Sequence, residues 1–293
     1  KNLMTYAFSE LWLVSRGSHD SHNRNLCKHG EDIMSDRVTL VTGASSGIGR
    51  ELALLAAEDS RAVVVVARRR ERLEEVAAEI EGAGSEGIVH TADLTEIDQR
   101  RGILEEMERR ELPVDHLINN AGLGLGGRFD ENSPDAERSM VELNVGGLHD
   151  LCTRFLPGMV RRGYGRVLNV ASTAAWQPLP YMATYAATKA FVLSLSGALW
   201  KEFRGTGVTV TCLAPGRTET EFFDDPNLPD IWFSRAPTSS PEDVARAGYR
   251  GMLAGRRVVV PGWHNKLMAF LSPRMPGRLV LAVAAALFRP RGE

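Results

Sequence analysis

Tyr185 and Lys189 are four residues apart in a segment, Tyr185–Phe203, whose apolar residues recur with helical spacing. Side chains four apart on a helix share a face, so the phenol and the ammonium are expected to lie close together. A free phenol has a pKa of about 10, a poor match for proton transfer at neutral pH, and a nearby ammonium lowers it. The pair is suited to exchange a proton with a carbonyl or alcohol oxygen, although this spacing alone is common by chance.

Two further polar residues are candidates for the same chemistry. Ser172 follows the apolar run Val167–Ala171, and parallel sheets bind ligands beyond the carboxyl ends of their strands. Its hydroxyl can hold a substrate oxygen beside Tyr185; the ordinary alternative is a serine in a turn. Asn144 lies inside the helical pattern Asp135–Arg162, where asparagine is a mediocre helix former. Either a polar kink that holds water or a hydrogen-bonded amide explains it.

A glycine-rich turn indicates a nucleotide. The sequence Thr42-Gly43-Ala44-Ser45-Ser46-Gly47-Ile48-Gly49 follows a predicted strand and opens a predicted helix. Glycine lets the backbone turn sharply and approach a pyrophosphate, and the helix N-terminus offers free N–H groups and a partial positive charge. Such a turn alone is a weak signal, but its strand–turn–helix setting favours dinucleotide binding.

The end of the second predicted strand indicates which dinucleotide. An acid usually stands there when the cofactor is NAD, but this chain reads Val66-Ala67-Arg68-Arg69-Arg70. Arginine can pair with a 2′-phosphate through two charge-assisted hydrogen bonds. The alternative is the solvated start of the charged helix Arg70–Glu81, yet three arginines at a helix N-terminus oppose its dipole. NADP(H) is therefore predicted in preference to NAD(H).

Strand and helix patterns alternate from Val38 onward. Buried strands are predicted at Val38–Val41, Ala62–Val66, Gly87–Thr91, His116–Asn119, Arg166–Val170, Val208–Leu213 and Val258–Pro261. Helices are predicted at Ile48–Glu58, Arg70–Glu81, Glu96–Arg110, Asp135–Arg162, Tyr185–Phe203 and Pro241–Leu253. This alternation predicts an α/β fold, a single doubly wound Rossmann domain with a parallel sheet of about seven strands.

Composition argues against several other classes. The 293 residues are 43% hydrophobic and 25% charged, as in ordinary globular domains, and the net charge of −2 argues against nucleic-acid binding. Cys27, Cys152 and Cys212 form no CxxC pair, which indicates reduced thiols and a cytoplasmic location. The longest apolar stretch, Leu279–Phe288, is half the roughly 20 residues that cross a membrane. The scattered histidines predict no metal site.

Three regions are expected along the chain. Residues 1–36 are interpreted as a disordered leader or a remnant that is not native to the protein, without the segments of a signal peptide. Residues 37–262 form the domain, with Glu219–Ser240 as an insertion over the ligand crevice. Residues 263–293 form a C-terminal helical extension with apolar segments at Leu267–Leu271 and Leu279–Phe288, flanked by basic residues. Packing on the domain or across an oligomer interface is the ordinary explanation, and peripheral contact with a membrane or a lipid substrate is the alternative.

Over residues Arg37–Gly262 the chain resembles the short-chain dehydrogenase/reductase family. The matching residues, in the family's order and approximate spacing, are Thr42–Gly49, Asp93, Asn119–Gly122, Asn144, Ser172, Tyr185, Lys189 and Pro215–Gly216. The resemblance implies that Tyr185 is the catalytic acid/base, that Lys189 binds the ribose and lowers the tyrosine pKa, and that Ser172 orients the substrate. It also implies that Asn144 supports a proton-relay water.

The resemblance implies a larger cofactor site. Together with Tyr185 and Lys189, its residues are Gly43, Ser45, Ser46, Gly47, Ile48, Gly49, Arg68, Arg69, Asp93, Leu94, Asn120, Ala121, Gly122, Pro215, Gly216 and Thr218. Asp93 is implied to contact adenine, and the segment Pro215–Thr218 to meet the nicotinamide carboxamide. A homodimer or homotetramer formed through the long helices is implied as well.

The expected substrate is a small carbonyl compound or secondary alcohol. Apolar residues near the crevice in sequence favour an acyl, steroid-like or aromatic compound. These residues are Trp176, Leu179, Phe222, Phe223, Trp232 and Phe233. The alternatives are a polyol or hydroxysteroid dehydrogenase, and a non-catalytic NADP-binding sensor or scaffold. The intact set of Ser172, Tyr185 and Lys189 favours an enzyme.

Overall fold

The computed structural model describes residues 36–221 and 238–289. At its centre is a seven-stranded parallel sheet in the order β3-β2-β1-β4-β5-β6-β7. The strands are β1 (Val38–Thr42), β2 (Ala62–Ala67), β3 (Glu86–Thr91), β4 (Val114–Asn119), β5 (Gly165–Val170), β6 (Val208–Leu213) and β7 (Val258–Val259). The predicted doubly wound Rossmann fold with about seven parallel strands is confirmed. The edge strand β7 ends before Pro261, which has no N–H to donate to a ladder.

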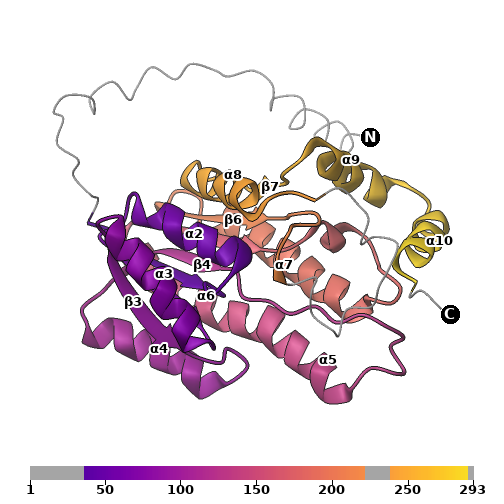
Figure 1. The fold of residues 1–293 in the computed structure, drawn as a ribbon. Coiled ribbons are helices and arrows are strands. Elements are labelled where there is room, and N and C mark those ends of the chain that lie inside the picture. The colour runs from indigo at the N-terminus through magenta and orange to yellow at the C-terminus, as the bar shows by residue number, and fades with distance from the viewer. Residues whose placement is uncertain (1–35, 222–237, 290–293) are drawn as a thin grey trace. The chain divides into compact units, whose positions relative to one another are not determined.

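Helices cover both faces of the sheet (Figure 1). On one face lie α2 (Gly47–Ala57), α3 (Arg70–Gly82) and α8 (Pro241–Leu253). On the other lie α4 (Ile97–Arg109), α6 (Leu148–Arg162) and α7 (Ala183–Glu202). Successive strand residues point to opposite faces, so Val64 packs into one core and Val65 into the other. Both faces of the sheet are therefore buried from solvent, which is why these strands are continuous apolar runs.

The segment predicted as one helix, Asp135–Arg162, is interrupted in the structure. Helix α5 (Pro134–Val141) passes through a π-helical turn, η2 (Glu142–Gly147), into α6. Two glycines in this turn weaken helix propensity, and a Cβ at Gly147 would lie 3.1 Å from the Leu94 carbonyl oxygen. The prediction of an uninterrupted helix is therefore wrong at this turn, which contains Asn144.

The sheet order determines where a ligand can bind. The chain moves to the opposite side of β1 between β3 and β4, so a crevice opens beyond the carboxyl ends of β1 and β4. Predicted site residues stand within two residues of six strand ends. They are the glycine turn after β1, Arg68 after β2, Asp93 after β3, Asn120 after β4, Ser172 after β5 and Pro215 after β6.

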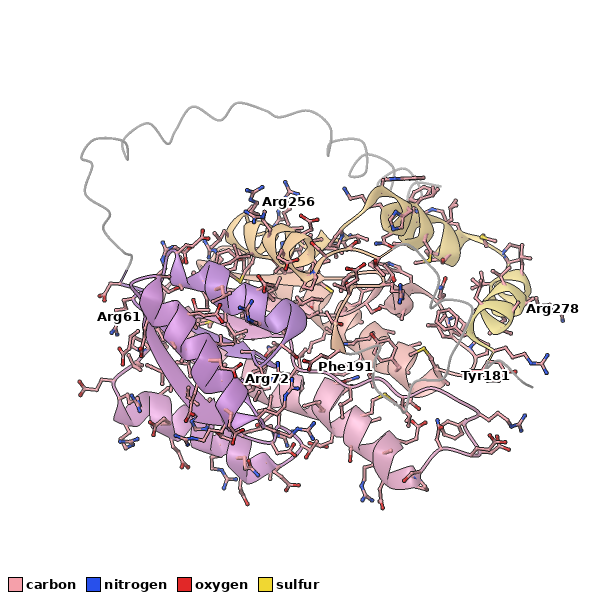
Figure 2. The ribbon with its side chains drawn as sticks, in the orientation of Figure 1. Arg61, Arg72, Tyr181, Phe191, Arg256 and Arg278 are labelled. Atoms are coloured by element: carbon pink, nitrogen blue, oxygen red, sulfur yellow. The ribbon has the colours of Figure 1, made fainter. Side chains whose placement is uncertain are left out.

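The C-terminal extension forms the two helices that its apolar segments indicate. Helix α9 (Trp263–Leu271), a short 3₁₀ turn η6 (Ser272–Arg274) and α10 (Gly277–Phe288) follow β7, and Arg278 projects from the start of α10 (Figure 2). Val280, Ala284 and Phe288 of α10 are buried in a cluster with residues that flank and begin α7. No helix in residues 36–221 and 238–289 is long and apolar enough to cross a membrane. The leader expected at residues 1–36 and most of the expected insertion lie outside the described residues.

Candidate active site

A cavity of about 470 Å³ lies at the carboxyl ends of the strands, a volume typical of small-molecule sites. Eighteen of the twenty predicted site residues line it; the exceptions are Gly49 and Asn144. Residues far apart in sequence thus converge on one cavity, with the glycine turn on one side and Tyr185 on the other.

The shape of the glycine turn requires glycine. Gly43 has a φ of +65°, and a Cβ there would lie 2.8 Å from the Ala121 Cα. A Cβ at Gly49 would lie 2.2 Å from the Gly43 carbonyl oxygen, so Gly49 acts from beneath the turn by allowing this close approach. The N-cap Ser46 makes no side-chain cap, and no acid stands in the first turn of α2. The first N–H groups of this helix suit a phosphate.

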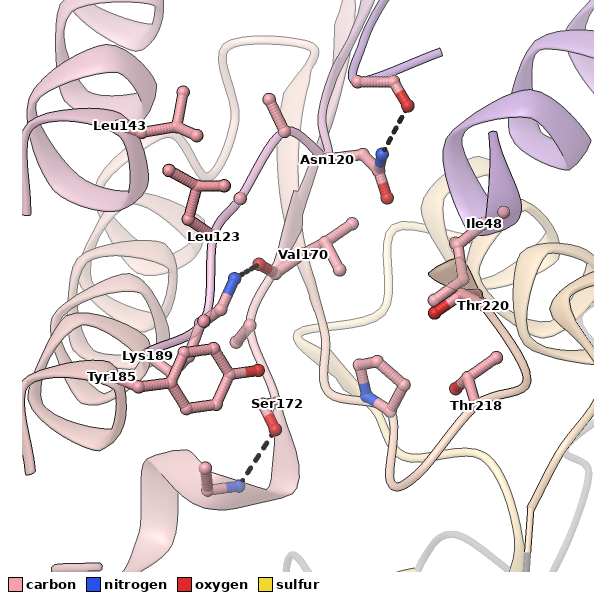
Figure 3. A pocket seen from close by; sticks show the side chains of 18 of the residues that line it. Ile48, Asn120, Leu123, Leu143, Val170, Ser172, Tyr185, Lys189, Thr218 and Thr220 are labelled. Atoms are coloured by element: carbon pink, nitrogen blue, oxygen red, sulfur yellow. Dashed lines mark hydrogen bonds between the residues drawn. The ribbon is translucent and has the colours of Figure 1, made fainter. Parts of the chain in front are cut away.

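Asn120 ties the glycine turn to the end of β4. Its Nδ2 donates to the carbonyl oxygens of Thr42 at 3.1 Å and Gly43 at 3.2 Å (Figure 3). In return the Thr42 hydroxyl accepts hydrogen bonds from the backbone N–H groups of Asn120 at 3.0 Å and Ala121 at 3.1 Å. These bonds fix the backbone on both sides of the crevice entrance, so the turn is preorganised.

Arg69 stands at one corner of the cavity, next to the glycine turn. Its guanidinium donates to the hydroxyls of Ser45 at 3.1 Å and Ser46 at 2.9 Å, beside the helix N-terminus. It also pairs with the Glu221 carboxylate at 2.8 Å, which Arg72 approaches at 3.6 Å. The hydrogen bond from Arg69 lowers the pKa of Glu221. Sequence reasoning missed Glu221 because 152 residues separate it from Arg69 and only the fold brings them together.

Arg68 and Asp93 lie together at the ends of β2 and β3. The guanidinium of Arg68 is 3.9 Å from the Asp93 carboxylate and is largely exposed to solvent. Asp93 also accepts hydrogen bonds from the backbone N–H and hydroxyl of Thr95. Burial would raise the pKa of Asp93, but the Thr95 hydrogen bonds and the Arg68 charge lower it overall. The neighbouring carbonyl of Leu94 is held by Arg100 at 3.1 Å.

Tyr185 and Lys189 project from one face of α7 toward the end of β5 (Figure 3). The Lys189 Nζ donates to the Val170 carbonyl at 3.0 Å and lies 5.8 Å from the centroid of the Tyr185 ring. Ser172 caps a short 3₁₀ turn, η3 (Thr173–Trp176), where its hydroxyl accepts from the Ala174 N–H at 3.1 Å. A hydrogen bond joins the Ser172 and Tyr185 side chains. Two hydroxyls therefore face the same part of the cavity.

Burial is the largest influence on the pKa values of Tyr185 and Lys189 in the protein by itself. It raises the pKa of Tyr185 to about 12, although the hydrogen bond from Ser172 acts in the opposite direction. It lowers the pKa of Lys189 to about 8. The expected lowering of the phenol pKa by the ammonium does not prevail over burial. The phenol is consequently protonated at neutral pH, the form that donates a proton.

Asn144 acts on the cavity wall from behind. Its buried amide accepts from the Leu123 N–H at 2.8 Å and donates to the Leu123 carbonyl at 2.9 Å and the Thr188 hydroxyl at 3.1 Å. A Cβ on Gly122 would lie 3.3 Å from both the Asn144 Oδ1 and the Lys189 Nζ. Asn144 therefore stands in a π-helical turn and its amide is hydrogen-bonded, as the second alternative expects, while a water-holding role stays a prediction.

The C-terminal helices complete the cavity, which sequence reasoning missed. Met268 of α9 and Leu287 and Phe288 of α10 line it. Asn265 of α9 packs against Gly216, where a Cβ would lie 2.4 Å from the Asn265 Oδ1. The sequence shows that the extension is apolar. That it borders the cavity follows from the packing of α10 against residues that flank and begin α7, which only the tertiary structure shows.

The apolar residues expected near the substrate divide into three groups. Leu179 is buried and lines the cavity. Trp176 instead packs against the core on the face of the sheet that α4, α6 and α7 cover. The remaining four, which lie outside the described residues, are Phe222, Phe223, Trp232 and Phe233. Met182, a residue not singled out in the sequence, lines the cavity beside Leu179.

Comparisons with known proteins agree with this geometry. A family model described as short chain dehydrogenase matches residues 37–228. A putative ketoacyl reductase from Streptomyces coelicolor is 36% identical over 199 residues, 67% of this chain and 76% of that protein. The 11-beta-hydroxysteroid dehydrogenase A of Sesamum indicum is 32% identical over 247 residues, 80% of this chain and 70% of that protein.

A solved structure extends the likeness to three dimensions. A short-chain dehydrogenase from Sphingobium yanoikuyae in complex with NADPH superposes with a TM-score of 0.73 at 29% identity, covering 81% of this chain and 93% of that one. The fold and the cavity define an oxidoreductase that acts on CH–OH or C=O groups with NAD(P). The chain belongs to the short-chain dehydrogenase family.

The Asn144 contacts generate the first prediction. Asn144→Ala should lower the free energy of unfolding by about 1–3 kcal/mol, because it removes the three hydrogen bonds of a buried amide and leaves the partly buried Leu123 N–H and carbonyl unpaired. Chemical denaturation measures this loss. Asn132→Ala, which removes a half-buried asparagine bonded to Glu137, is the matched control and should cost less. Equal losses in the two variants would contradict the assigned role.

Proposed function

We propose that this protein is an NADP(H)-dependent oxidoreductase that interconverts a carbonyl and a secondary alcohol on an apolar substrate. The observation that carries the proposal is the meeting of the Tyr185 and Ser172 hydroxyls in the cavity that the glycine turn opens. An intact proton donor, a buried lysine beside it and a nucleotide-binding turn favour turnover over a binding-only sensor.

The residues present fit a dinucleotide. The glycine turn leaves no room for side chains where a pyrophosphate would approach, and α2 begins there with uncapped N–H groups. The cavity continues from this turn past Asn120 to Lys189, so an elongated ligand can reach from Arg68 to Tyr185. When bound, the nicotinamide supplies or accepts the hydride.

The chain's own residues supply the proton and the orientation. In reduction, the Tyr185 hydroxyl donates its proton to the carbonyl oxygen as negative charge develops there. The Ser172 hydroxyl donates a second hydrogen bond to that oxygen and so positions it. Lys189, held by the Val170 carbonyl, places a positive charge near the phenol and stabilises the phenolate that remains. In oxidation the same groups act in reverse.

The choice of NADP(H) rests on charge. Arg68 and Arg69 line the cavity where β2 ends, and no acid follows that strand before α3. The pairing of Arg69 and Arg72 with the Glu221 carboxylate supports this corner as an anion site. A 2′-phosphate is the anion that distinguishes the two nicotinamide cofactors. The NADPH complex of the relative from Sphingobium yanoikuyae adds support.

The proposed substrate is apolar because its end of the cavity is apolar. Leu179 and Met182 lie beside Tyr185, and Met268, Leu287 and Phe288 face them from the C-terminal helices. Acyl, steroid-like and aromatic carbonyl compounds suit such walls. The names of the relatives, a ketoacyl reductase and a hydroxysteroid dehydrogenase, fall in the same chemical range.

The remaining proposals concern the whole protein. Residues 37–262 are proposed as the catalytic domain and residues 263–293 as an extension that borders the substrate. A homodimer or homotetramer through α5, α6 and α7 is proposed by analogy with the family. The free, buried thiols of Cys152 and Cys212 support a cytoplasmic location.

Tyr185→Phe tests the acid/base role. The variant should reduce carbonyl compounds at least about 100-fold more slowly, because proton transfer by a positioned group contributes that much or more. Its affinity for NADPH should be nearly unchanged, which fluorescence titration measures. Tyr181→Phe, four residues earlier and outside α7, is the matched control. Retention of turnover by Tyr185→Phe would contradict the assignment.

The ionisation of the pair predicts a pH dependence. Reduction needs a protonated phenol and a charged lysine, and the pKa of Lys189 is about 8 whereas that of Tyr185 is about 12. The kcat/KM for reduction should therefore be level below neutrality and fall as the pH rises through about 8, where the ammonium is lost. Oxidation of the alcohol needs the phenolate and the charged lysine, so its rate should instead rise with pH up to about 8 and then level off. A reduction rate that stays level into strongly alkaline solution would show that the ammonium is not required.

The two cavity arginines test cofactor choice. Replacing Arg68 and Arg69 with Ala should raise the Kd of NADPH by about 100-fold, since each lost charge-assisted contact costs about 1.5 kcal/mol or more. The Kd of NADH should change little. Arg70→Ala is the matched control, because Arg70 pairs with Glu74 on α3 and does not line the cavity. Equal losses for the two cofactors would mean that these arginines do not read the 2′-phosphate.

A further inference from the structure

The outer surface of the two C-terminal helices is apolar to an unusual degree. On α9, Trp263, Leu267, Phe270 and Leu271 recur at the spacing of one helix face and are all exposed, Trp263 to 76%. Scattered exposed apolar residues are ordinary on a protein surface, but a helical stripe of large ones is not. This stripe is directed away from the domain that α9 packs on.

Helix α10 carries two apolar faces. All ten residues from Leu279 to Phe288 are apolar. One face, Val280, Ala284 and Phe288, is buried against the domain. The next face, Leu279, Val283 and Leu287, is exposed, the first two to 49% and 48%. A helix that is apolar all round is normally covered on all sides, and this one is covered on one.

The charges of these helices have one sign. Lys266, Arg274, Arg278 and Arg289 are exposed, and residues 263–289 contain no Asp or Glu. Within the described parts of the chain, no carboxylate lies at ion-pair distance from any of the four. Other surface arginines of the domain mostly have such partners, as Arg101 and Arg138 do. Arg274 also stacks on the Phe270 ring and donates to the Phe270 carbonyl. Apolar side chains surrounded by cations without a carboxylate partner among the described residues are typical of a helix that lies on an anionic lipid surface.

We propose that α9 and α10 dock on the surface of a membrane that contains anionic phospholipids. The exposed residues of both helices enter the boundary between headgroups and acyl chains, and the four cations contact lipid phosphates. Neither helix is long enough to cross the bilayer, so the docking is peripheral.

Charge argues against a second copy of the chain as the occupant of this surface. In a two-fold symmetric dimer the same patch meets itself, so the cations of one copy would approach those of the other, and residues 263–289 supply no Asp or Glu to pair with them. An anionic membrane satisfies both the apolar residues and the cations.

The docked orientation also indicates where the substrate comes from, an inference that rests on the proposed function. Leu287 belongs both to the exposed face of α10 and to the lining of the cavity, and Met268 and Phe288 line the cavity next to it. Docking therefore places the apolar end of the cavity at the lipid surface. The substrate class that follows is a carbonyl or alcohol compound that partitions into the bilayer and enters the cavity from it.

Vesicle co-sedimentation of the full chain tests the docking without reference to activity. One set of vesicles is phosphatidylcholine alone, and the other contains about one third phosphatidylglycerol. The protein should bind the anionic vesicles at least about tenfold more strongly, and added salt should reduce the difference. Equal failure to bind both sets would overturn the proposal.

Two variants and a control locate the docking surface. Leu267→Ser with Leu279→Ser and Val283→Ser should abolish binding, and Lys266→Gln with Arg278→Gln should weaken it about 10-fold to 30-fold. The matched control replaces the exposed Ile97, Phe129 and Leu253 with Ser and should bind as the parent does. A control that loses binding equally would overturn the assignment of the surface.

Two further measurements separate the alternatives. Light scattering without vesicles should give the apolar variant the same mass as the parent; a smaller mass would show that the stripe is a contact between copies and would overturn membrane docking. Turnover of a water-soluble carbonyl with NADPH should be unchanged in that variant. If the parent protein turns over no carbonyl at all, the proposed function fails while the vesicle result still decides the docking.

Discussion

A parallel sheet that is buried on both faces can bind a ligand only at its ends, because helices cover everything else. The order of the strands places the crevice at the carboxyl ends of β1 and β4. Every strand from β1 to β6 then delivers a polar or glycine residue to this edge as soon as it ends. The cavity is thus a consequence of strand order, and the hydrogen bonds of Asn120 with Thr42 and Gly43 keep the two middle strand ends in register.

The chemistry of the site depends on burying one titratable pair. Burial holds the Tyr185 phenol in its protonated form and makes the Lys189 ammonium easier to lose. The Val170 carbonyl keeps the lysine in position, while the missing Cβ of Gly122 leaves room for it beside the wall. The buried phenol is therefore protonated at neutral pH in the protein by itself. The glycines of the site matter for space: each admits a neighbour that a Cβ would exclude.

The C-terminal helices join substrate binding to the outer surface. Phe288 is buried beside Leu179 and Met182, and Leu287 beside it is exposed and also lines the cavity. The same short helix therefore lines the apolar end of the cavity and presents apolar residues outward. This double use explains why every residue from Leu279 to Phe288 is apolar, which a helix with one covered face would not need.

Local patterns in the sequence determined the strands and helices, the glycine turn, the arginines after β2 and the Tyr185–Lys189 spacing, because each is set by residues near one another in the chain. The π-helical turn at Asn144, the pairing of Glu221 with Arg69 and the placement of Met268 and Phe288 in the cavity were decided by tertiary structure. Those contacts join residues that are distant along the chain, and periodicity carries no information on which distant residues meet. The ionisation of Tyr185 belongs with them, since burial, the cause that dominates its pKa, exists only once the chain has folded.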